Sequence, residues 1–508
     1  MTKSDCQTRR PDVATAVPLK GRLVEDQYIA DNPDVADAIK HKKFKGAVDH
    51  FEAYGAFEMR HPEGASHAFD YRFESCRISA RGDLFFSGWM DDRFIKCQNL
   101  AVQLGYSSLT IPVDRISRYH RNDVSRHLGI GPAEWPASFW CATPTEKFFH
   151  GSVSGIGGCY LGNSLVHAKL EARALSCERM LLSFSTLLSS MSNPLTHLLC
   201  AADAESLATI RALWLRHLES ATRFQSLTVG RPSAKRPRLS LITVLYGSHD
   251  LIQVQAALLW QRLEPDVEII VVCNSPEIAG SLERAAQAIH ACYGCNLQLL
   301  IMSGNCGFGM ANNIAADHAR GSALAFVNPD VLPHGSERET RLLDAAEHAK
   351  EQRHVIGPCL FYGSGAVMHA GMDIISEPVV GSDVATALRV HHRSKGIPGA
   401  MAESLAPSPV PAVTGGLLII GRSEFEELGG FRSDYVFGHY EDADLCLRAW
   451  ESRMQVWFDP ALRFVHLEGE GSKGEGFSTG ISHYNRAQFT RHWSDQLAGT
   501  LERVGAAA

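Results

Sequence analysis

The chain has 508 residues, of which 45% are hydrophobic and 21% charged, and its formal net charge at pH 7 is -7. This length is too great for one hydrophobic core, so we expect roughly two to four domains. The ordinary composition indicates a globular protein, and the acidic balance argues against a general nucleic-acid binder, so no nucleic-acid partner is expected.

The N-terminal part of the chain divides into a polar stretch and a helical one. Residues 1–22 are polar, and we expect them to form a disordered tail. Residues 23–62 carry apolar side chains at roughly helical spacing, and Pro33 follows Asn32 at a position where the first turn of a helix tolerates proline. We therefore predict a small helical module over residues 23–62.

Residues 68–174 have the alternating pattern of β-strands, as in Leu-Phe-Phe-Ser-Gly-Trp at 84–89. The alternation predicts a β-rich accessory domain resembling a β-sandwich. Its tryptophans Trp89, Trp135 and Trp140 are candidates for stacking on a sugar ring, although aromatic side chains of a sandwich more often belong to its core.

The sequence pattern in the middle of the chain predicts a connection between domains. Residues 175–229 have mostly helical periodicity and predict a helical connector. Residues 230–238 contain two prolines and four basic residues, a composition that favours a linker. Contact of this basic stretch with an anionic bilayer is the alternative.

The C-terminal half alternates between strand and helix patterns. Apolar runs at residues 239–246, 267–272, 297–302 and 323–327 are separated by helical stretches, which predicts an α/β domain with a mostly parallel central sheet. We place this domain at residues 239–495 and expect a short tail at 496–508. Ligands of such sheets bind beyond the carboxyl ends of the strands.

Polar residues follow the third and fourth of these strands. Asn305 and Asn312 belong to a glycine-rich run in which a ligand can approach the backbone, and an asparagine side chain both donates and accepts hydrogen bonds. Asn328, Pro329 and Asp330 follow the fourth strand. One carboxylate beside a diphosphate suits Mg²⁺, which keeps phosphate and water oxygens as ligands, although this tripeptide alone is usually a turn.

An acidic cluster follows further along the chain. A buried strand is predicted at 417–420 and a short helix at 424–428, and then Glu441, Asp442 and Asp444 open another helix. The free N–H groups and the dipole of a helix N-terminus offset part of the carboxylate repulsion, and a carboxylate held there can serve as a general base. The alternative is a capped, solvated helix start.

Two further features lie on either side of this cluster. His466 closes a predicted strand just before a glycine-rich stretch. The long segment 376–409 contains glycine, proline and basic residues, which fits part of an acceptor site, a mobile lid or a plain surface insertion.

Five motifs in order resemble the inverting family 2 glycosyltransferases with the GT-A fold, close to the bacterial rhamnosyltransferase-like members. The matching text is NCGFGMANN, FVNPDV, TGGLLIIGRSEFEELGGF, HYEDADLCLRAW and HLEGEGS. The predicted helical module resembles a short module that recurs in bacterial glycosyltransferases and some secreted repeat proteins. The β-rich region resembles an accessory domain that precedes some glycosyltransferase domains.

This resemblance implies roles for individual residues. Asp330 would face a divalent cation, Mg²⁺ or Mn²⁺, and the donor diphosphate, with Asn328 near the donor ribose or phosphate. Asn305 and Asn312 would belong to the donor-nucleotide site. His466 matches a position that is a metal ligand in some members.

In the acidic cluster, the resemblance makes Asp442 the catalytic base, and Glu441 would bind the acceptor or support the base. The chain departs from the family at two places. Cys273-Asn274 stands where members often have Asp after the second strand, and Leu245-Tyr246-Gly247 replaces the usual Thr-Tyr-Asn. Both departures leave the donor base and sugar open.

The resemblance predicts an enzyme that moves a sugar from a nucleotide-diphosphate donor to a glycan or lipid-linked glycan acceptor in bacterial surface polysaccharide synthesis. The alternative is a catalytically degenerate sugar-binding protein, although both Asp442 and Asp330 are present. A nucleotidyltransferase is disfavoured because the first strand lacks a basic glycine-rich loop.

The expected compartment is the cytoplasm, and peripheral contact at the inner face of the plasma membrane is the alternative. The sequence shows no apolar core of a signal peptide and no uninterrupted apolar run of about 18 residues. The 13 cysteines are scattered, which favours reduced thiols over a disulfide framework.

Overall fold

The structure of the protein is a computed structural model that describes residues 25–50, 70–79, 82–93, 97–104, 107–131, 135–143, 152–161, 164–200, 204–231, 236–334, 338–379, 384–467 and 479–507. The predicted disordered tail, residues 1–22, lies outside these ranges. The chain forms two compact units. The first comprises Met1–Ser176, Ser190–Asn193 and Ala201–Thr209, and the second comprises Cys177–Ser189, Pro194–Cys200 and Ile210–Ala508.

The first unit begins with three short helices, α1 (Glu25–Asp31), α2 (Pro33–Lys40) and α3 (Ala47–His50). The predicted helix start at Pro33 is confirmed, with Asn32 as its N-cap residue. Tyr28, Val35 and Ala47 form a small buried core between the helices. Residues 51–62 of the predicted helical module lie outside the described ranges.

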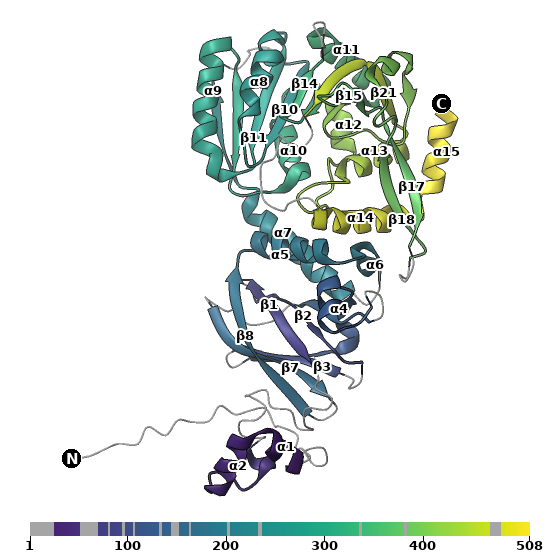
Figure 1. The fold of residues 1–508 in the computed structure, drawn as a ribbon. Coiled ribbons are helices and arrows are strands. Elements are labelled where there is room, and N and C mark those ends of the chain that lie inside the picture. The colour runs from purple at the N-terminus through teal and green to yellow at the C-terminus, as the bar shows by residue number, and fades with distance from the viewer. Residues whose placement is uncertain are drawn as a thin grey trace, which may run out of the picture. The chain divides into compact units, whose positions relative to one another are not determined.

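The described strands of the first unit form one sheet of eight strands in the order β4-β3-β7-β8-β1-β2-β6-β5 (Figure 1). The strands are β1 (Tyr71–Ser79), β2 (Leu84–Met90), β3 (Cys97–Leu104), β4 (Ser107–Pro112), β5 (Ser117–Tyr119), β6 (Ser138–Thr143), β7 (Ser152–Leu161) and β8 (Ser164–Leu175). They pair antiparallel except β1 with β8. The predicted β-rich region is therefore a single sheet in these strands and not two packed sheets.

The tryptophans of this sheet have different environments. Trp89 and Trp140 are buried, as expected for core side chains. Trp135 is partly exposed and its indole N–H donates to Asp92 Oδ1 at 3.1 Å. A short 3-10 helix (Val113–Arg115) and helix α4 (Asn122–His127) complete the described elements around these strands.

The predicted helical connector is partly wrong. Residues 175–229 contain helices α5 (Cys177–Ser190), α6 (Pro194–Leu198) and α7 (Ala204–Ala221), but their last part is a strand, β9 (Phe224–Val229). Strand β9 pairs antiparallel with β12 and closes one edge of the large sheet. The second compact unit therefore begins before residue 239, because β9 and most of these helices belong to it.

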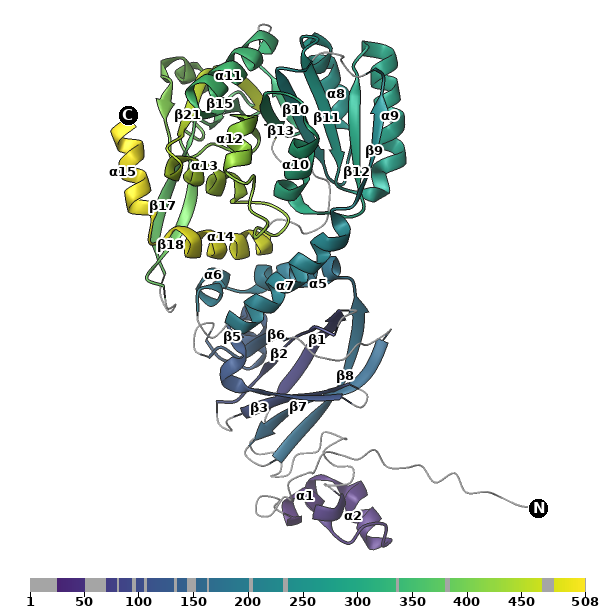
Figure 2. The same ribbon diagram turned by 180° about the vertical axis from the view of Figure 1, so that it is seen from behind.

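The second unit is built on a mixed sheet of eleven strands, with the main order β14-β21-β15-β20-β13-β10-β11-β12-β9 (Figure 2). The four predicted strands are confirmed as β10 (Leu239–Leu245), β11 (Val267–Cys273), β12 (Leu297–Met302) and β13 (Ala323–Val327), and they pair parallel. The sheet as a whole is less parallel than predicted, because β9, β14 and β20 run antiparallel to their neighbours.

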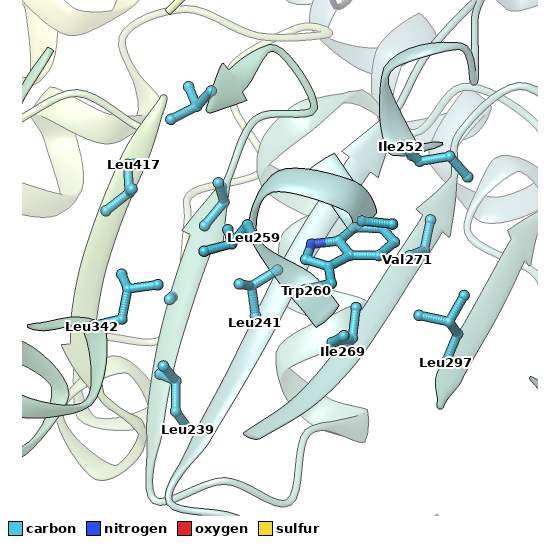
Figure 3. Close-up of a cluster of buried hydrophobic side chains, with 14 of the residues drawn as sticks. Leu239, Leu241, Ile252, Leu259, Trp260, Ile269, Val271, Leu297, Leu342 and Leu417 are labelled. Carbon is cyan, nitrogen blue, oxygen red and sulfur yellow. The ribbon is translucent and has the colours of Figure 1, made fainter. Parts of the chain in front are cut away.

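Helices cover both faces of this sheet. Helices α8 (Leu251–Leu258), α9 (Ala279–Tyr293) and α11 (Arg338–Gln352) share one core with the sheet, and the two ribbon views place α10 (Gly307–His318) on the opposite face. Figure 3 shows Trp260, from the 3-10 turn after α8, packed over the strands near Leu241, Ile269 and Val271.

The remaining elements lie toward the other edge of the sheet. The predicted strand and helices of the acidic region are confirmed as β20 (Leu417–Gly421), α12 (Arg422–Glu427) and α13 (Glu441–Glu451). The other strands and helices are β14 (Val331–Pro333), β15 (His354–Phe361), β16 (Val367–His369), β17 (Met372–Pro378), β18 (Thr386–His392), a 3-10 helix (Gly399–Ser404), β19 (Ser408–Pro409), β21 (Gln455–His466) and α14 (Thr479–Trp493).

The predicted C-terminal tail is wrong. Residues 496–508 contain helix α15 (Leu497–Ala507), which buries Leu497, Thr500 and Val504. Thr500 and Arg503 both bond the carboxylate of Glu451 at the end of α13. An amphipathic helix that packs against α13 thus ends the described chain. Among the described helices, none combines the length and apolar character that a bilayer span requires.

Candidate active site

A cavity of about 520 Å³ lies at the edge of the large sheet where the parallel strands end. Strands β10, β11 and β13 end at this edge, and β20 begins there because it is antiparallel to β13. The loops after the parallel strands and before β20 therefore supply the polar lining. These lining residues include Tyr246, Asn274, Asn305, Asn328, Asp330, Thr414, Gly415, Gly416, Glu441, Asp442 and His466.

Asp330 and His466 meet although they are far apart in sequence. The antiparallel pairing of β14 with β21 sets Val331 opposite His466, and this register brings His466 Nε2 to 3.3 Å from Asp330 Oδ1. Both side chains are buried and both line the cavity. The other ring nitrogen, Nδ1, lies 3.3 Å from the sulfur of Met368.

This pair fits a divalent cation by its donor set. One carboxylate oxygen and one imidazole nitrogen are ligands that Mg²⁺ or Mn²⁺ accepts, and two ligands about 2.1 Å from one ion at a right angle lie about 3 Å apart. Among the described residues no cluster of three His, Cys, Asp or Glu side chains is placed to hold a metal. Two protein ligands leave the remaining positions to substrate and water oxygens.

The carboxylate of Asp442 is held by backbone donors. Oδ2 accepts from the N–H of Gly415 at 2.8 Å, and Oδ1 accepts from the N–H of Ala443 at 2.8 Å. A Cβ atom at Gly415 would lie 3.1 Å from the ring of Phe308 and 3.5 Å from Asp442 Cβ, so a side chain there would crowd this approach. The Thr-Gly-Gly turn before β20 thereby orients the carboxylate of Asp442 into the cavity.

Glu441 has a different environment from its neighbour. Its side chain is only 5% exposed, and its Oε2 has no hydrogen-bond partner among the described residues. Burial, together with the nearby charge of Asp442, raises the pKa of Glu441 well above its ordinary value. The first turn of α13 therefore presents one carboxylate held by N–H donors and one carboxyl group that favours its neutral form.

Asp444 does not reach the cavity. It is fully buried, and its oxygens accept from Arg432 Nη1 at 3.2 Å, Tyr435 OH at 3.2 Å, Trp493 Nε1 at 2.9 Å and Arg448 Nε at 2.8 Å. These partners come from the loop before α13, from α13 itself and from α14. Asp444 is therefore a structural anchor of the helix that carries Asp442.

The predicted donor-binding asparagines separate into two groups. Asn305 and Asn328 line the cavity. Asn305 Oδ1 accepts from Asn274 Nδ2 at 2.9 Å and from Gly307 N at 3.0 Å, so this amide is fixed at the start of α10. Asn312 does not belong to the cavity lining, because its buried side chain donates to the carbonyl of Phe308 in its own helix at 3.0 Å.

Tyr246 and Asn274, which belong to the two stretches that depart from the family pattern, line the same wall as Asn305. Burial raises the pKa of the Tyr246 hydroxyl to about 12, so this group is a neutral hydrogen-bonding partner at neutral pH. Among the described residues, the wall at the ends of β10 and β11 therefore offers amide and hydroxyl groups and no carboxylate.

The loop before α13 has an unusual backbone conformation, which the sequence did not predict. Phe437, His439 and Tyr440 have φ angles of 60°, 82° and 75°, in a region that L-residues seldom adopt. Asn485 of α14 holds this loop, because it accepts from Val436 N at 2.9 Å and donates to Val436 O at 2.9 Å and to Gly438 O. Strained backbone of this kind clusters at functional sites, and the aromatic residues beside Gly438 were its only sequence signal.

Part of segment 376–409 forms a wall of the cavity. Strands β17 and β18 pair as a hairpin, and Val390 and His392 of β18 line the cavity. The basic side chains expected near an acceptor are engaged elsewhere, since Arg389 pairs with Glu377 at 2.6 Å and Arg393 with Asp373 at 2.6 Å. His392 is the basic residue of this segment that reaches the cavity among its described residues.

A family model described as the N-terminal domain of galactosyltransferase matches residues 399–470. This stretch contains Asp442, Glu441 and His466. The region that forms one side of the cavity is therefore similar to part of a glycosyltransferase domain.

The uncharacterized protein y4gI of Sinorhizobium fredii (strain NBRC 101917 / NGR234) is 25% identical over 234 residues, which cover 45% of this chain and 24% of that protein. The chain thus spans well under half the length of this curated relative.

Two solved structures align with this chain at low TM-scores. GalNAc-T7 with UDP, GalNAc and Mn2+ matches with a TM-score of 0.38 and 16% identity over 51% of this chain and 49% of its own. The mannosyltransferase PcManGT from Pyrobaculum calidifontis, in complex with GDP-Man and Mn2+, matches with a TM-score of 0.32 and 16% identity over 65% of this chain and 88% of its own.

Proposed function

We propose that the second unit is an inverting glycosyltransferase of the GT-A type, which moves a sugar from a nucleotide-diphosphate donor to a hydroxyl group. The observation that carries this proposal is the meeting of Asp442 with the pair Asp330 and His466 around one cavity. A positioned base and a pair of cation ligands are the two parts that this reaction needs.

The donor would lie against the ends of β10, β11 and β13. Asn274, Asn305, Asn328 and Tyr246 supply hydrogen-bonding groups there, and the N-terminus of α10 favours a negative charge. Asp330 and His466 would hold a divalent cation, which when bound neutralises charge on the leaving diphosphate. Because the described residues of this wall include no carboxylate that could bind the nucleobase, donor selectivity would depend on neutral hydrogen bonds.

Asp442 would act on the acceptor. A hydroxyl group is a poor nucleophile near neutral pH, and a carboxylate that removes its proton during attack contributes about 10²–10⁴ in rate. The backbone N–H groups of Gly415 and Ala443 hold the carboxylate while a further lone pair takes the proton. Displacement by one activated hydroxyl, without a nucleophilic carboxylate on the opposite face, inverts the anomeric centre.

Glu441 would complement this base in its neutral form. A carboxyl group that keeps its proton can donate a hydrogen bond to the acceptor, and it adds no second negative charge beside Asp442. The glycan or lipid-linked nature of the acceptor, the role in bacterial surface polysaccharide synthesis and the place of action in the cytoplasm or at the inner membrane face remain predictions from the family resemblance.

The direct experiment is a panel of nucleotide sugars assayed for release of nucleotide diphosphate by the purified full-length protein. We expect release from one donor class, loss of release in excess chelator, and recovery with Mn²⁺ or Mg²⁺. Asp330→Ala is expected to recover much less. The anomeric configuration of a transferred product, measured by NMR, tests inversion.

Two results would contradict the proposal in different ways. Full activity in excess chelator would remove the cation from the mechanism and shift charge neutralisation to protein side chains. Tight binding of a nucleotide sugar without any release, with or without added acceptors, would favour the degenerate sugar-binding protein.

A further inference from the structure

A buried amide lies in the apolar core close to the candidate cation site. Gln255 belongs to the inner face of helix α8, where it is fully buried together with Ile252 and Ala256. These two apolar neighbours belong to the hydrophobic cluster that α8 shares with the sheet. Burying a polar group costs free energy unless the group is hydrogen-bonded, and an apolar side chain of similar size would fill this place without that cost. The hydrogen bonds of Gln255 therefore indicate what the residue does.

Both N–H groups of this amide bond to one turn. Gln255 Nε2 donates to the carbonyl of Asn328 at 2.9 Å and to the carbonyl of Val331 at 3.0 Å. These residues are the first and last of Asn328-Pro329-Asp330-Val331, the segment that carries Asp330. Val331 N also donates to Asn328 O at 3.0 Å, which closes the segment as a β-turn with proline at its second position. Gln255 thus holds the turn at both ends.

The orientation of the amide is fixed by strand β10. The hydroxyl of Thr243, which is fully buried, donates to Gln255 Oε1 at 3.2 Å. An amide with its nitrogen and oxygen exchanged would present an oxygen to two carbonyl oxygens, and neither contact could then be a hydrogen bond. The contacts of Gln255 therefore allow one orientation, in which the NH2 group faces the turn.

The same turn is bonded to both neighbouring parts of the site. Asn328 N donates at 2.9 Å to the carbonyl of Gly416, in the Thr-Gly-Gly turn that orients the proposed catalytic base. The carbonyl of Asp330 accepts from Leu467 N at 3.0 Å, directly after the strand that ends in His466. A displacement of the turn would therefore change the distance between the two candidate cation ligands.

Gln255 acts on the site only through the backbone of this turn. The described lining of the cavity does not include Gln255, so its side chain does not contact a substrate there. Asp330 Oδ1 lies 3.3 Å from His466 Nε2, and a binding site must hold its ligands within about 0.5 Å of the productive geometry. A fully hydrogen-bonded amide in the core is a device that fixes one such geometry.

We propose that Gln255 is a positioning residue of the cation site. With its amide oriented by Thr243, it holds the Asn328–Val331 turn and thereby keeps the carboxylate of Asp330 at the distance from His466 that a shared divalent cation requires. This inference rests on the proposed function, because that function places the cation at Asp330 and His466. It adds a residue that contacts neither the cation nor the substrate.

The test measures how much Mn²⁺ tightens the binding of a nucleotide diphosphate. UDP, GDP and dTDP are each titrated by calorimetry into the full-length protein, with saturating Mn²⁺ and in excess EDTA. The ratio of the two dissociation constants is the Mn²⁺ enhancement. We expect an enhancement of about tenfold or more in the wild type for at least one of the three, and almost none in Asp330→Ala.

Gln255→Met keeps a side chain of similar size and removes both donors. We expect its Mn²⁺ enhancement to fall to about threefold or less, with an affinity in EDTA within about twofold of the wild type. In donor hydrolysis, the Mn²⁺ concentration for half-maximal rate should rise and saturating Mn²⁺ should restore most of kcat, because both ligands remain. Affinities that fall equally with Mn²⁺ and in EDTA would show a general structural role and overturn the inference.

Two matched variants separate positioning from a loss of stability. Ile252→Ala removes a fully buried apolar side chain from the same face of α8, and we expect a lower melting temperature with an unchanged Mn²⁺ enhancement. Gln261→Met changes an exposed glutamine that donates to Ala257 O, and should change neither quantity. A Mn²⁺ enhancement that Ile252→Ala lowers as much as Gln255→Met does would contradict the positioning role.

Thr243→Val tests the orientation of the amide. Valine has nearly the shape of threonine but cannot donate to Gln255 Oε1, so part of the Mn²⁺ enhancement should be lost. An unchanged enhancement in the folded Thr243→Val protein overturns the orienting role of Thr243. Where Gln255→Met does not fold, the same result overturns the whole inference.

The outcomes also separate this inference from the proposed function. A wild type that shows the Mn²⁺ enhancement, with an equal enhancement in Gln255→Met, contradicts the role of Gln255 alone. A wild type whose affinity for all three nucleotide diphosphates is the same with Mn²⁺ and in EDTA contradicts the cation site of the proposed function, and this inference with it.

Discussion

Glu441, Asp442 and Asp444 stand within one helical turn, yet each has a separate environment. Asp444 is fully buried and bonded to Arg, Tyr and Trp side chains, Asp442 accepts from two backbone N–H groups, and Glu441 is buried beside a neighbouring charge. The three acidic groups therefore divide into a structural anchor, a carboxylate oriented by backbone donors and a group that favours its protonated form.

At the scale of single residues, we predict that Asp442→Asn lowers kcat for sugar transfer on the order of 10²-fold or more. The reason is that an amide cannot take the proton of the acceptor hydroxyl. The Asn oxygen can still accept from Gly415, so folding and donor binding should change little. Turnover and donor affinity, the latter by calorimetry, are measured side by side. Turnover near that of the wild type would move the base elsewhere, with Glu441 as the first candidate.

Glu441 gives a prediction about stability against pH. Because its pKa is raised in the folded protein, it binds its proton more tightly folded than unfolded. Its contribution is therefore fully present below the unfolded pKa of about 4.3 and is lost as the pH rises through the folded pKa. Glu441→Gln cannot ionise and escapes this loss.

We expect the free energy of unfolding of Glu441→Gln, relative to the wild type, to rise as the pH increases from about 4.3 into the alkaline range. Urea unfolding at a series of pH values measures this difference. A difference that stays constant across the series would show that Glu441 ionises as readily in the folded protein as in the unfolded chain.

At the scale of elements, helix α13 and the strained loop before it depend on α14. Asn485 bonds the backbone of Val436 and Gly438, and Trp493 bonds Asp444. The loop residues at positive φ each add about 1–3 kcal/mol of strain, which only such external bonds can hold in place. The position of Asp442 is therefore set by a helix some forty residues further along the chain.

We predict that Asn485→Ala lowers both stability and turnover. Removing this amide leaves buried backbone groups of the loop without partners, which costs about 1–3 kcal/mol for each group. Thermal unfolding and kcat are the measurements. Gln488→Ala is the matched control on the same helix, since Gln488 bonds Tyr484 and Arg491 rather than the loop, and equal effects of the two variants would contradict the role of Asn485.

At the scale of the whole molecule, the second compact unit extends further upstream than the predicted linker at residues 230–238. Strand β9 pairs with β12, and in helix α7 the indole of Trp214 donates to Ser433 O at 2.7 Å, next to the strained loop. His217 Nε2 lies 2.7 Å from the carbonyl oxygen of Asn305. Segments before residue 239 thus support both the sheet edge and the cavity.

We predict that a fragment of residues 176–508 folds and releases nucleotide diphosphate from the donor, whereas a fragment of residues 239–508 is insoluble or inactive. The shorter fragment exposes the edge of β12 and the apolar surface that Trp214 covers. Solubility, circular dichroism and donor hydrolysis compare the two. A folded and fully active shorter fragment would show that β9 and α7 are dispensable.

The sequence alone determined the features that local pattern controls. Buried strands β10, β11, β12 and β13 were visible as short apolar runs, because a strand covered on both faces is apolar along its length. The start of α13 and the polar residues after the strands were visible for the same local reason. Since parallel strands end at one edge, this pattern also predicted a ligand site beyond the strand ends, whereas the family resemblance alone placed Asp330 and Asp442 in one site.

Only the tertiary structure decided the features that depend on long-range pairing and burial. The pairing of β9 with β12, and of β14 with β21 beside Asp330, follows from contacts between distant segments that no local pattern encodes. The tertiary structure also placed the side chain of Asn312 outside the cavity, and burial raised the pKa of Glu441. It brought His369 and His392 within hydrogen-bond distance of each other. The sequence shows which residues have side chains capable of chemistry. The free-energy cost of burying each polar group depends on the residues that the fold packs around it. Only the tertiary structure therefore decides which of these groups face the cavity.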